Sequence, residues 1–235
     1  MPPLYYLHPL TKVPSYRITA ELALKLLGYG RDARTDEQLA ADFLDGVGLL
    51  SGLPNDPALW QQTHQSDARA AHQIFRPEVQ RLAVGHCLNG QYPWLAATPG
   101  EFIWTPEGSG QVYYWCPFSQ QLPREPSSMQ EIRLVFNAAV TGWTRPVMDY
   151  LVWTPSGSIL KSYRPDTVLL HESGLTARQL WEDLIFPRVQ AFYQDFVAPQ
   201  LVTRGISLEV PDVAYLPITQ ADLTPEQLIT ALATQ

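Results

Sequence analysis

One short stretch of the chain, TPGEFIWTPEGSGQVYYWCPF at residues 98–118, gathers aromatic side chains that could contact a nucleic-acid base. Tyr113 and Trp115 alternate with Val112 and Tyr114, so on a strand Tyr113 and Trp115 would share one face. Aromatic rings at this spacing can stack on the bases of a splayed single strand, or they can fill a protein core. The sequence leaves both interpretations open.

Metal-ligating and nucleophilic side chains do not gather into a recognisable motif. His64 and His72 could share a helix face, but at a spacing of i, i+8 they cannot chelate one ion, and the adjacent pair His86-Cys87 has no second pair to complete a zinc site. The sequence also lacks a Ser-His-Asp arrangement, a Gly-rich phosphate loop and a Walker motif. It therefore predicts neither a zinc centre nor a nucleotide-binding loop.

Composition narrows the class of protein. The chain has 235 residues, of which 46% are hydrophobic and 17% charged, as expected for a packed core without long disordered tails. The formal net charge of −7 argues against nonspecific nucleic-acid binding by bulk charge, although it leaves room for a local basic groove. Two cysteines fit a reducing cytoplasm, and no window has the length of an apolar membrane span or a signal-peptide core. A cytoplasmic protein without a membrane partner is the expectation.

Local signals predict a helical first third and a mixed remainder. Residues 1–17 look extended, and 18–85 is expected to be helical, with Thr35 and Gln38 forming a capping box. The helices expected in this region are 18–30, 35–48, 56–60, 66–75 and, after a break at Arg76-Pro77, 78–84.

The predicted core spans residues 98–200 as hairpin, helix, hairpin and helix, followed by a C-terminal extension at 201–235. Ser128 and Glu131 read as the capping box of the middle helix, which Gly142 ends. The long helix starts at a second box, Thr176 with Gln179, and is expected to kink at Pro187. The remaining expected elements are strands near 101–105 and 111–116, a second hairpin that turns at 155–157, and a last helix from Thr224. One α+β domain over 1–235 is the economical interpretation.

Several stretches, in order, resemble the YqaJ-type viral recombinases, relatives of lambda exonuclease in the PD-(D/E)xK nuclease superfamily. They are ITAELALKLLG, PWLAATPGEF, YYWCPF, FNAAVTGW, VMDYLVWTPSG and LWEDLIFPRVQAFYQDFVAP, and they cover roughly residues 17 to 200. The resemblance implies a core of a small mixed sheet flanked by helices, a phage or mobile-element setting, and an ancestry in DNA recombination. In that family, acidic residues hold Mg²⁺ on the scissile phosphate, and a lysine positions or activates the attacking water.

The residues that carry this chemistry in the family are replaced here. The resemblance puts Gly100 at the aspartate, Tyr113 at the glutamate, Trp115 at the lysine, Arg76 at the upstream glutamate and Arg133 at the helical glutamine. Mg²⁺ prefers hard oxygen ligands, and a neutral tyrosine hydroxyl is a poor one. The resemblance therefore implies a degenerate site without catalytic residues, metal or cofactor. Tyr113, Trp115 and the two arginines become candidates for binding DNA, with the guanidinium groups contacting phosphate where a metal once did. The alternative is that Arg76 and Arg133 are surface arginines of their helices.

Three functions follow as hypotheses. The first is a non-catalytic accessory protein that binds DNA ends or single-stranded DNA. The second is a structural or interaction subunit whose partner is a recombination or mobile-element protein, or a second copy of the chain. The third is a Mg²⁺-dependent nuclease with relocated acids, for which Glu101 is the fallback residue with Glu78 or Asp149 assisting. A one-residue slip would turn Glu101 away from the site unless a bulge intervenes. Asp149 is instead expected to form a cross-strand ion pair with Lys161.

Overall fold

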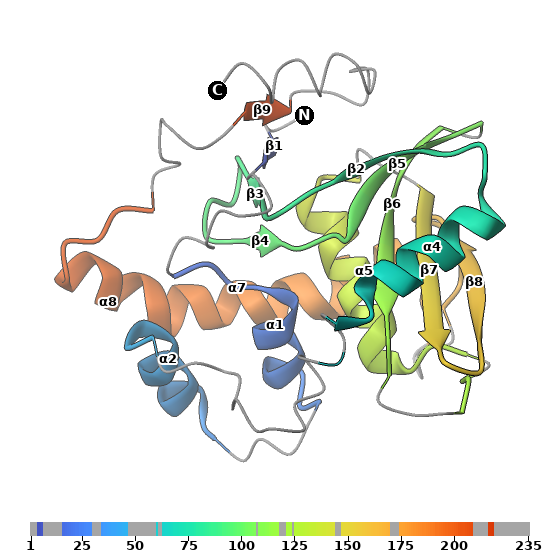
Figure 1. The fold of residues 1–235 in the computed structure, drawn as a ribbon. Coiled ribbons are helices and arrows are strands. Elements are labelled where there is room, and N and C mark those ends of the chain that lie inside the picture. The colour runs from blue at the N-terminus through green and yellow to red at the C-terminus, as the bar shows by residue number, and fades with distance from the viewer. Residues whose placement is uncertain are drawn as a thin grey trace.

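A mixed five-stranded sheet with the strand order β2-β5-β6-β7-β8 forms the centre of the molecule (Figure 1). The computed structural model describes residues 4–6, 16–29, 34–46, 60, 63–106, 108–117, 121–123, 125–143, 147–169, 174–208 and 216–218. The strands are β2 (Gln80–Ala83), β5 (Glu101–Thr105), β6 (Gly108–Trp115), β7 (Val147–Thr154) and β8 (Gly157–Tyr163). The predicted α+β class and both predicted hairpins, β5–β6 and β7–β8, are confirmed.

The two hairpins are joined by helix α5 (Ser128–Val140), which carries the chain across the sheet so that β7 pairs parallel with β6. Gly142 ends this helix with a positive φ of 72°, as its position predicted. The predicted capping box is wrong, because the N-cap is Ser127 and makes no side-chain cap. Glu131 is 1% exposed and packs inside instead of reaching back to the helix start.

Helices cover both faces of this sheet. Helix α4 (Gln65–Phe75) shares a buried cluster with Tyr114 and Leu151, whereas α5 packs in the main core with Tyr150. Since Tyr150 and Leu151 are neighbours on β7, their side chains point to opposite faces. The α4 face and the α5 face of the sheet are therefore two separate environments, as the arrangement in Figure 1 also shows.

The expected helix at 78–84 is wrong, because residues 80–83 form β2 and pair antiparallel with β5. The break at Pro77 ends α4, and the outer edge of β5 then offers hydrogen bonds that outweigh a weak helical preference. A smaller sheet of order β4-β3-β1-β9 is built from segments outside residues 18–85, and its strand β1 lies in the segment 1–17 that was expected to be extended. These strands are β1 (Leu4–Tyr6), β3 (Cys87–Asn89), β4 (Ala96–Ala97) and β9 (Leu216–Ile218).

The remaining helices lie beside the sheet. Helix α1 (Ala20–Leu26) packs on α5, and α2 (Asp36–Leu44) begins with the predicted capping box of Thr35 and Gln38. The expected helices at 56–60 and from Thr224 lie outside the described residues, apart from Trp60. Among the helices that the structure describes, none combines the length and apolar character needed to cross a membrane.

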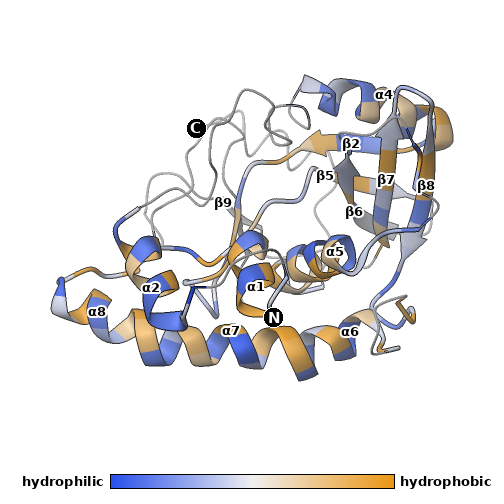
Figure 2. Ribbon diagram, turned by 90° about the horizontal axis from the view of Figure 1, so that it is seen from below, coloured by the Kyte–Doolittle hydropathy of each residue, from blue (hydrophilic) through white to orange (hydrophobic). Residues whose placement is uncertain are grey.

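The long helix consists of five consecutive segments. They are α6 (Ala177–Gln179), η1 (Leu180–Ile185), α7 (Phe186–Phe192), η2 (Tyr193–Val197) and α8 (Ala198–Thr203), and the predicted box of Thr176 and Gln179 is present at the start. Figure 2 shows apolar and polar residues interleaved along it. Both η segments are π-helical, and each directly precedes an α segment with a proline, Pro187 or Pro199, in its first turn. A wider π turn accommodates a residue that cannot donate to the helical ladder, so the irregularity expected at Pro187 takes this form.

Candidate functional site

A cavity of about 200 Å³ lies on the α5 face of the sheet, at the end of β6 where the resemblance puts the family site. Its walls come from five places in the chain: the start of α1, the β2–β3 connection, the residues after β4, strand β6 and helix α5. The lining residues are Thr19, Ala20, Glu21, His86, Thr98, Tyr113, Arg133 and Asn137. Two of the sequence candidates, Tyr113 and Arg133, therefore meet in one cavity.

Arg133 is held in a two-point contact by Glu21. Its Nε donates to Oε1 of Glu21 at 2.7 Å and Nη2 donates to Oε2 at 2.9 Å, while Nη1 donates to Gln130 at 3.0 Å. Burial lowers the pKa of Arg133, but the hydrogen bonds that it donates to Glu21 outweigh this effect and leave the pKa above its usual value. The guanidinium is therefore a permanent cation whose charge the chain itself balances.

Tyr113 presents a neutral ring to the cavity. Burial raises the pKa of Tyr113 to about 12, and the positive charge of Arg133 opposes the rise only in part. Its ring stacks on Tyr150, with centroids 6.0 Å apart and planes 7° from parallel. A hydroxyl that stays protonated at neutral pH is a poor ligand for Mg²⁺, whereas the fixed ring offers an aromatic surface.

The other walls are polar and uncharged. Burial lowers the pKa of His86, so its imidazole is neutral, and its buried Nδ1 has no hydrogen-bond partner among the described residues. Thr19 is the N-cap of α1 but its hydroxyl caps no backbone amide. The backbone amide of Thr98 donates to Oδ1 of Asn137 at 3.0 Å, which fixes the residues after β4 against α5.

Gly100, which the resemblance puts at an aspartate position, has no room for a side chain. A Cβ there would lie 2.8 Å from the Tyr114 ring and 2.9 Å from the carbonyl oxygen of Val112. The backbone amide of Gly100 donates to that same carbonyl at 3.0 Å, so the segment runs close against β6. The close approach of the backbone thus requires glycine at this position.

Trp115 and Arg76 lie away from the cavity. Trp115 is on the same face as Tyr113 but packs against Tyr150, with centroids 6.3 Å apart. Arg76 lies on the α4 face, where Nη2 donates to Ser162 at 3.0 Å and Nε lies 3.4 Å from Asp149. The structure therefore separates Arg76 from Arg133 by the thickness of the sheet.

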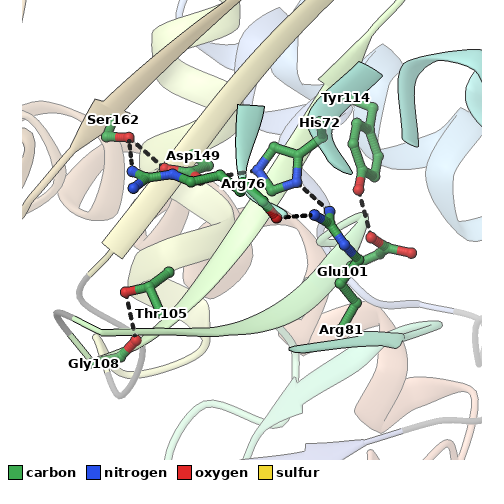
Figure 3. A network of polar contacts seen from close by, with 9 residues as sticks. All are labelled: His72, Arg76, Arg81, Glu101, Thr105, Gly108, Tyr114, Asp149 and Ser162. Atoms are coloured by element: carbon green, nitrogen blue, oxygen red, sulfur yellow. Dashed lines mark hydrogen bonds and ion pairs between the residues drawn. The ribbon is translucent and has the colours of Figure 1, made fainter. Parts of the chain in front are cut away.

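The α4 face carries a network of buried polar residues (Figure 3). Nε2 of His72 lies 2.9 Å from Oδ2 of Asp149, both fully buried, and Arg81 donates to Nδ1 of His72. Since a guanidinium can only donate, Nδ1 accepts and Nε2 carries the proton that binds Asp149. Ser162 adds a 2.5 Å hydrogen bond to Oδ1 of Asp149.

Glu101, the fallback acid, belongs to this same face and not to the cavity. Tyr114 donates to it at 2.5 Å, and Nε of Arg69 lies 2.5 Å from its other oxygen. Glu101 pairs with Val112, which pairs with Asp149, so the two carboxylates are two strands, or about 10 Å, apart. Glu78 is exposed. Among the described residues no three metal-ligating side chains come together.

The ion pair expected between Asp149 and Lys161 is wrong. Lys161 lies opposite Tyr150 in the β7–β8 register, so it points to the α5 face, and it pairs with Glu125. The register partner of Asp149 is Ser162.

Sequence reasoning missed Glu21, His86, Thr98 and Asn137 as parts of the cavity. The four lie in separate segments, and Glu21 and Arg133 are 112 residues apart in the chain. No local spacing links them, so the cavity emerges only from the tertiary arrangement.

Comparison with known proteins agrees with this architecture. No family model matches the chain, and no curated protein matches it. Among solved structures, it is similar to an alkaline exonuclease from Laribacter hongkongensis, with 15% sequence identity and a TM-score of 0.57 over 80% of this chain and 92% of that one. At this identity the likeness concerns the fold. The chain thus has a lambda-exonuclease-like α+β fold, with a five-stranded mixed sheet flanked by helices.

Proposed function

We propose that this chain is a non-catalytic relative of phage-type recombination exonucleases that binds single-stranded DNA or a DNA end. The observation that carries the proposal is the cavity itself, in which an aromatic ring, Tyr113, and a guanidinium, Arg133, stand side by side. An aromatic surface binds a base through stacking, and a guanidinium binds phosphate through paired hydrogen bonds. The fold of an exonuclease supplies the context for such a ligand.

The residues of the cavity favour binding over hydrolysis. Gly100 has no space for a carboxylate, and Tyr113 and Trp115 are aromatic where the resemblance puts an acid and a lysine. The carboxylates of Glu101 and Asp149 lie on the opposite face and are engaged by Arg69 and His72. A two-metal or single-metal clamp on a phosphate needs oxygen ligands that converge on one point.

The size and charge of the site set the expected affinity. A cavity of about 200 Å³ is smaller than a drug-sized pocket and suits one base at a time. Stacking contributes about 1–3 kcal/mol per base, and each neutralised phosphate of a single strand adds about −0.7 to the salt slope. With one arginine in the cavity and a net charge of −7, weak binding with a shallow salt dependence is expected.

The test is fluorescence anisotropy of labelled single-stranded and duplex DNA, over a salt series, with Mg²⁺ or with a chelator. Metal-independent binding that is lost in Tyr113→Leu and Arg133→Gln supports the proposal. Arg178→Gln is the matched control, because Arg178 is a half-exposed arginine that packs on Trp143, away from the cavity. Cleavage that requires Mg²⁺ would overturn the non-catalytic assignment. Equal DNA binding by the wild type and all variants would show that the cavity is not the DNA-binding site.

A second candidate, a structural or interaction subunit, has one observation in its favour. Arg133 and Arg76, the guanidinium groups proposed for DNA, both face carboxylates of the same chain. Absence of DNA binding at low salt in the wild type and in every variant would favour this function.

A further inference from the structure

We infer that Glu21 is an intramolecular competitor that occupies the phosphate-binding edge of Arg133, so that DNA must displace it. The inference rests on the proposed function, because it concerns how the same cavity opens to its ligand. Its basis is the two-point contact in which Nε and Nη2 of Arg133 each donate to one oxygen of Glu21.

The contact has the form that a phosphate would take. A guanidinium presents Nε–H and Nη2–H as two parallel donors, and carboxylates and phosphates both accept this pair through two oxygens. While Glu21 holds both donors, the phosphate-binding edge of Arg133 is filled. A phosphodiester can therefore reach the cavity only by exchange with the carboxylate.

The two partners differ in how easily they move. The side chain of Glu21 is 48% exposed, whereas that of Arg133 is 20% exposed. Glu21 can thus swing into solvent from the first turn of α1, while Arg133 stays anchored by its hydrogen bond to Gln130. Solvent screens part of an ion pair with such an exposed partner, so exchanging Glu21 for another anion costs less than it would in a fully buried pair.

The exchange preserves charge balance within the cavity. If Glu21 left without a replacement, a largely buried guanidinium would lose its counter-ion, which is unfavourable. A phosphodiester restores the balance, and the hydroxyl of Thr19 and the imidazole of His86 line the same cavity beside it. Ligand entry and release of Glu21 are therefore one coupled step.

The experiment compares DNA affinity in Glu21→Gln with the wild type, using a labelled single-stranded oligonucleotide and anisotropy at low salt. Removing an exposed competitor of this kind should tighten binding about two- to five-fold. Glu37→Gln, on the exposed first turn of α2, removes the same charge elsewhere and should leave the affinity unchanged. Glu21→Asp keeps the charge but shortens the reach, so its affinity should fall between the two.

The double variant Glu21→Gln with Arg133→Gln should not bind DNA more tightly than the wild type, because the guanidinium edge that Glu21→Gln exposes is then absent. Equal affinities of wild type and Glu21→Gln, or an equal gain in Glu37→Gln, would overturn the inference. If Arg133→Gln alone weakens binding while Glu21→Gln changes nothing, the proposed function stands and only the competitor role falls. If neither wild type nor Glu21→Gln binds, both fall together.

Discussion

Asp149→Asn tests whether the buried polar network fastens α4 to the sheet. Asp149 is fully buried and takes hydrogen bonds from His72 and Ser162, with Arg76 3.4 Å away. Asparagine has nearly the same shape but no charge, and its amide group cannot accept from all of these partners. The substitution therefore leaves at least one buried donor unmatched without opening a cavity.

The magnitude follows from the number and kind of contacts. Removing one partner of a buried charged pair typically costs about 3–5 kcal/mol, and the retained amide oxygen should place this variant near the lower end, about 3 kcal/mol. For a domain of this size each 1 kcal/mol shifts Tm by about 2–4 °C, so a fall of about 6–12 °C is expected. Ser162→Ala, which removes one uncharged donor, should cost only about 1 kcal/mol.

The pH dependence gives a second signature. Burial on its own raises the pKa of Asp149, but the hydrogen bonds from His72 and Ser162 and the charge of Arg76 outweigh it, and the pKa ends below its usual value. A depressed folded-state pKa stabilises the protein above the unfolded value of about 3.9, and this stability is lost as the pH falls. Asp149→Asn should therefore lower stability at pH 7 and flatten its decline toward acid pH.

Urea unfolding followed by tryptophan fluorescence, at pH 7 and at a series of lower pH values, measures both effects. If Asp149→Asn lowers the free energy of unfolding by less than about 1 kcal/mol, the scale of an exposed ion pair, the reasoning is refuted, because the network would then contribute little to stability. An unchanged acid slope would show that other carboxylates set the pH dependence.

Three further outcomes are expected. Gly100→Ala should destabilise the protein by about 1–3 kcal/mol in urea unfolding, since its Cβ would meet the Tyr114 ring at 2.8 Å; a neutral effect would contradict the close approach. Cys116 should resist alkylation at pH 8 until the protein unfolds, because burial and the charge of Asp67 raise the pKa of its thiol to about 12. Rapid labelling of the native protein at this cysteine, followed by mass spectrometry, would disprove that. Thr176→Ala should lower Tm through a loss of about 1 kcal/mol, as it removes the cap of the long helix, whereas Thr176→Ser should retain most of it.

Local signals predicted those parts of the fold that are decided locally. The capping boxes at Thr35 and Thr176 bring a side chain to a backbone amide three residues away, so the sequence alone specifies them. The opposite case is β2, whose partner β5 begins only at Glu101 and whose four residues carry no strong pattern of their own. The pairing, and not the propensity, decides its conformation.

The sequence identified some residues of the candidate site, but it did not predict where the fold would place them. Tyr113 was identified from the alternation along one strand, a local property. Arg133 and Arg76 both followed from the resemblance, yet the sheet lies between them, because one is on α5 and the other caps α4. Glu21, which neutralises Arg133, comes from α1, and no local sequence pattern predicts this pairing.

The two π-helical segments determine where the long helix can lose a residue without changing the orientation of its buried side chains. In an α-helix each residue turns the chain by about 100°, and a π turn takes up one residue more than an α turn. Deleting a single residue from η1 would let this segment return to α geometry while everything after it keeps its orientation. A deletion in α6 would instead rotate every side chain that follows it and carry Val189 and Phe192, both fully buried, toward solvent. The long helix thus tolerates the loss of one residue in η1 or in η2, whereas packing of its buried side chains fixes the number of residues in its α segments.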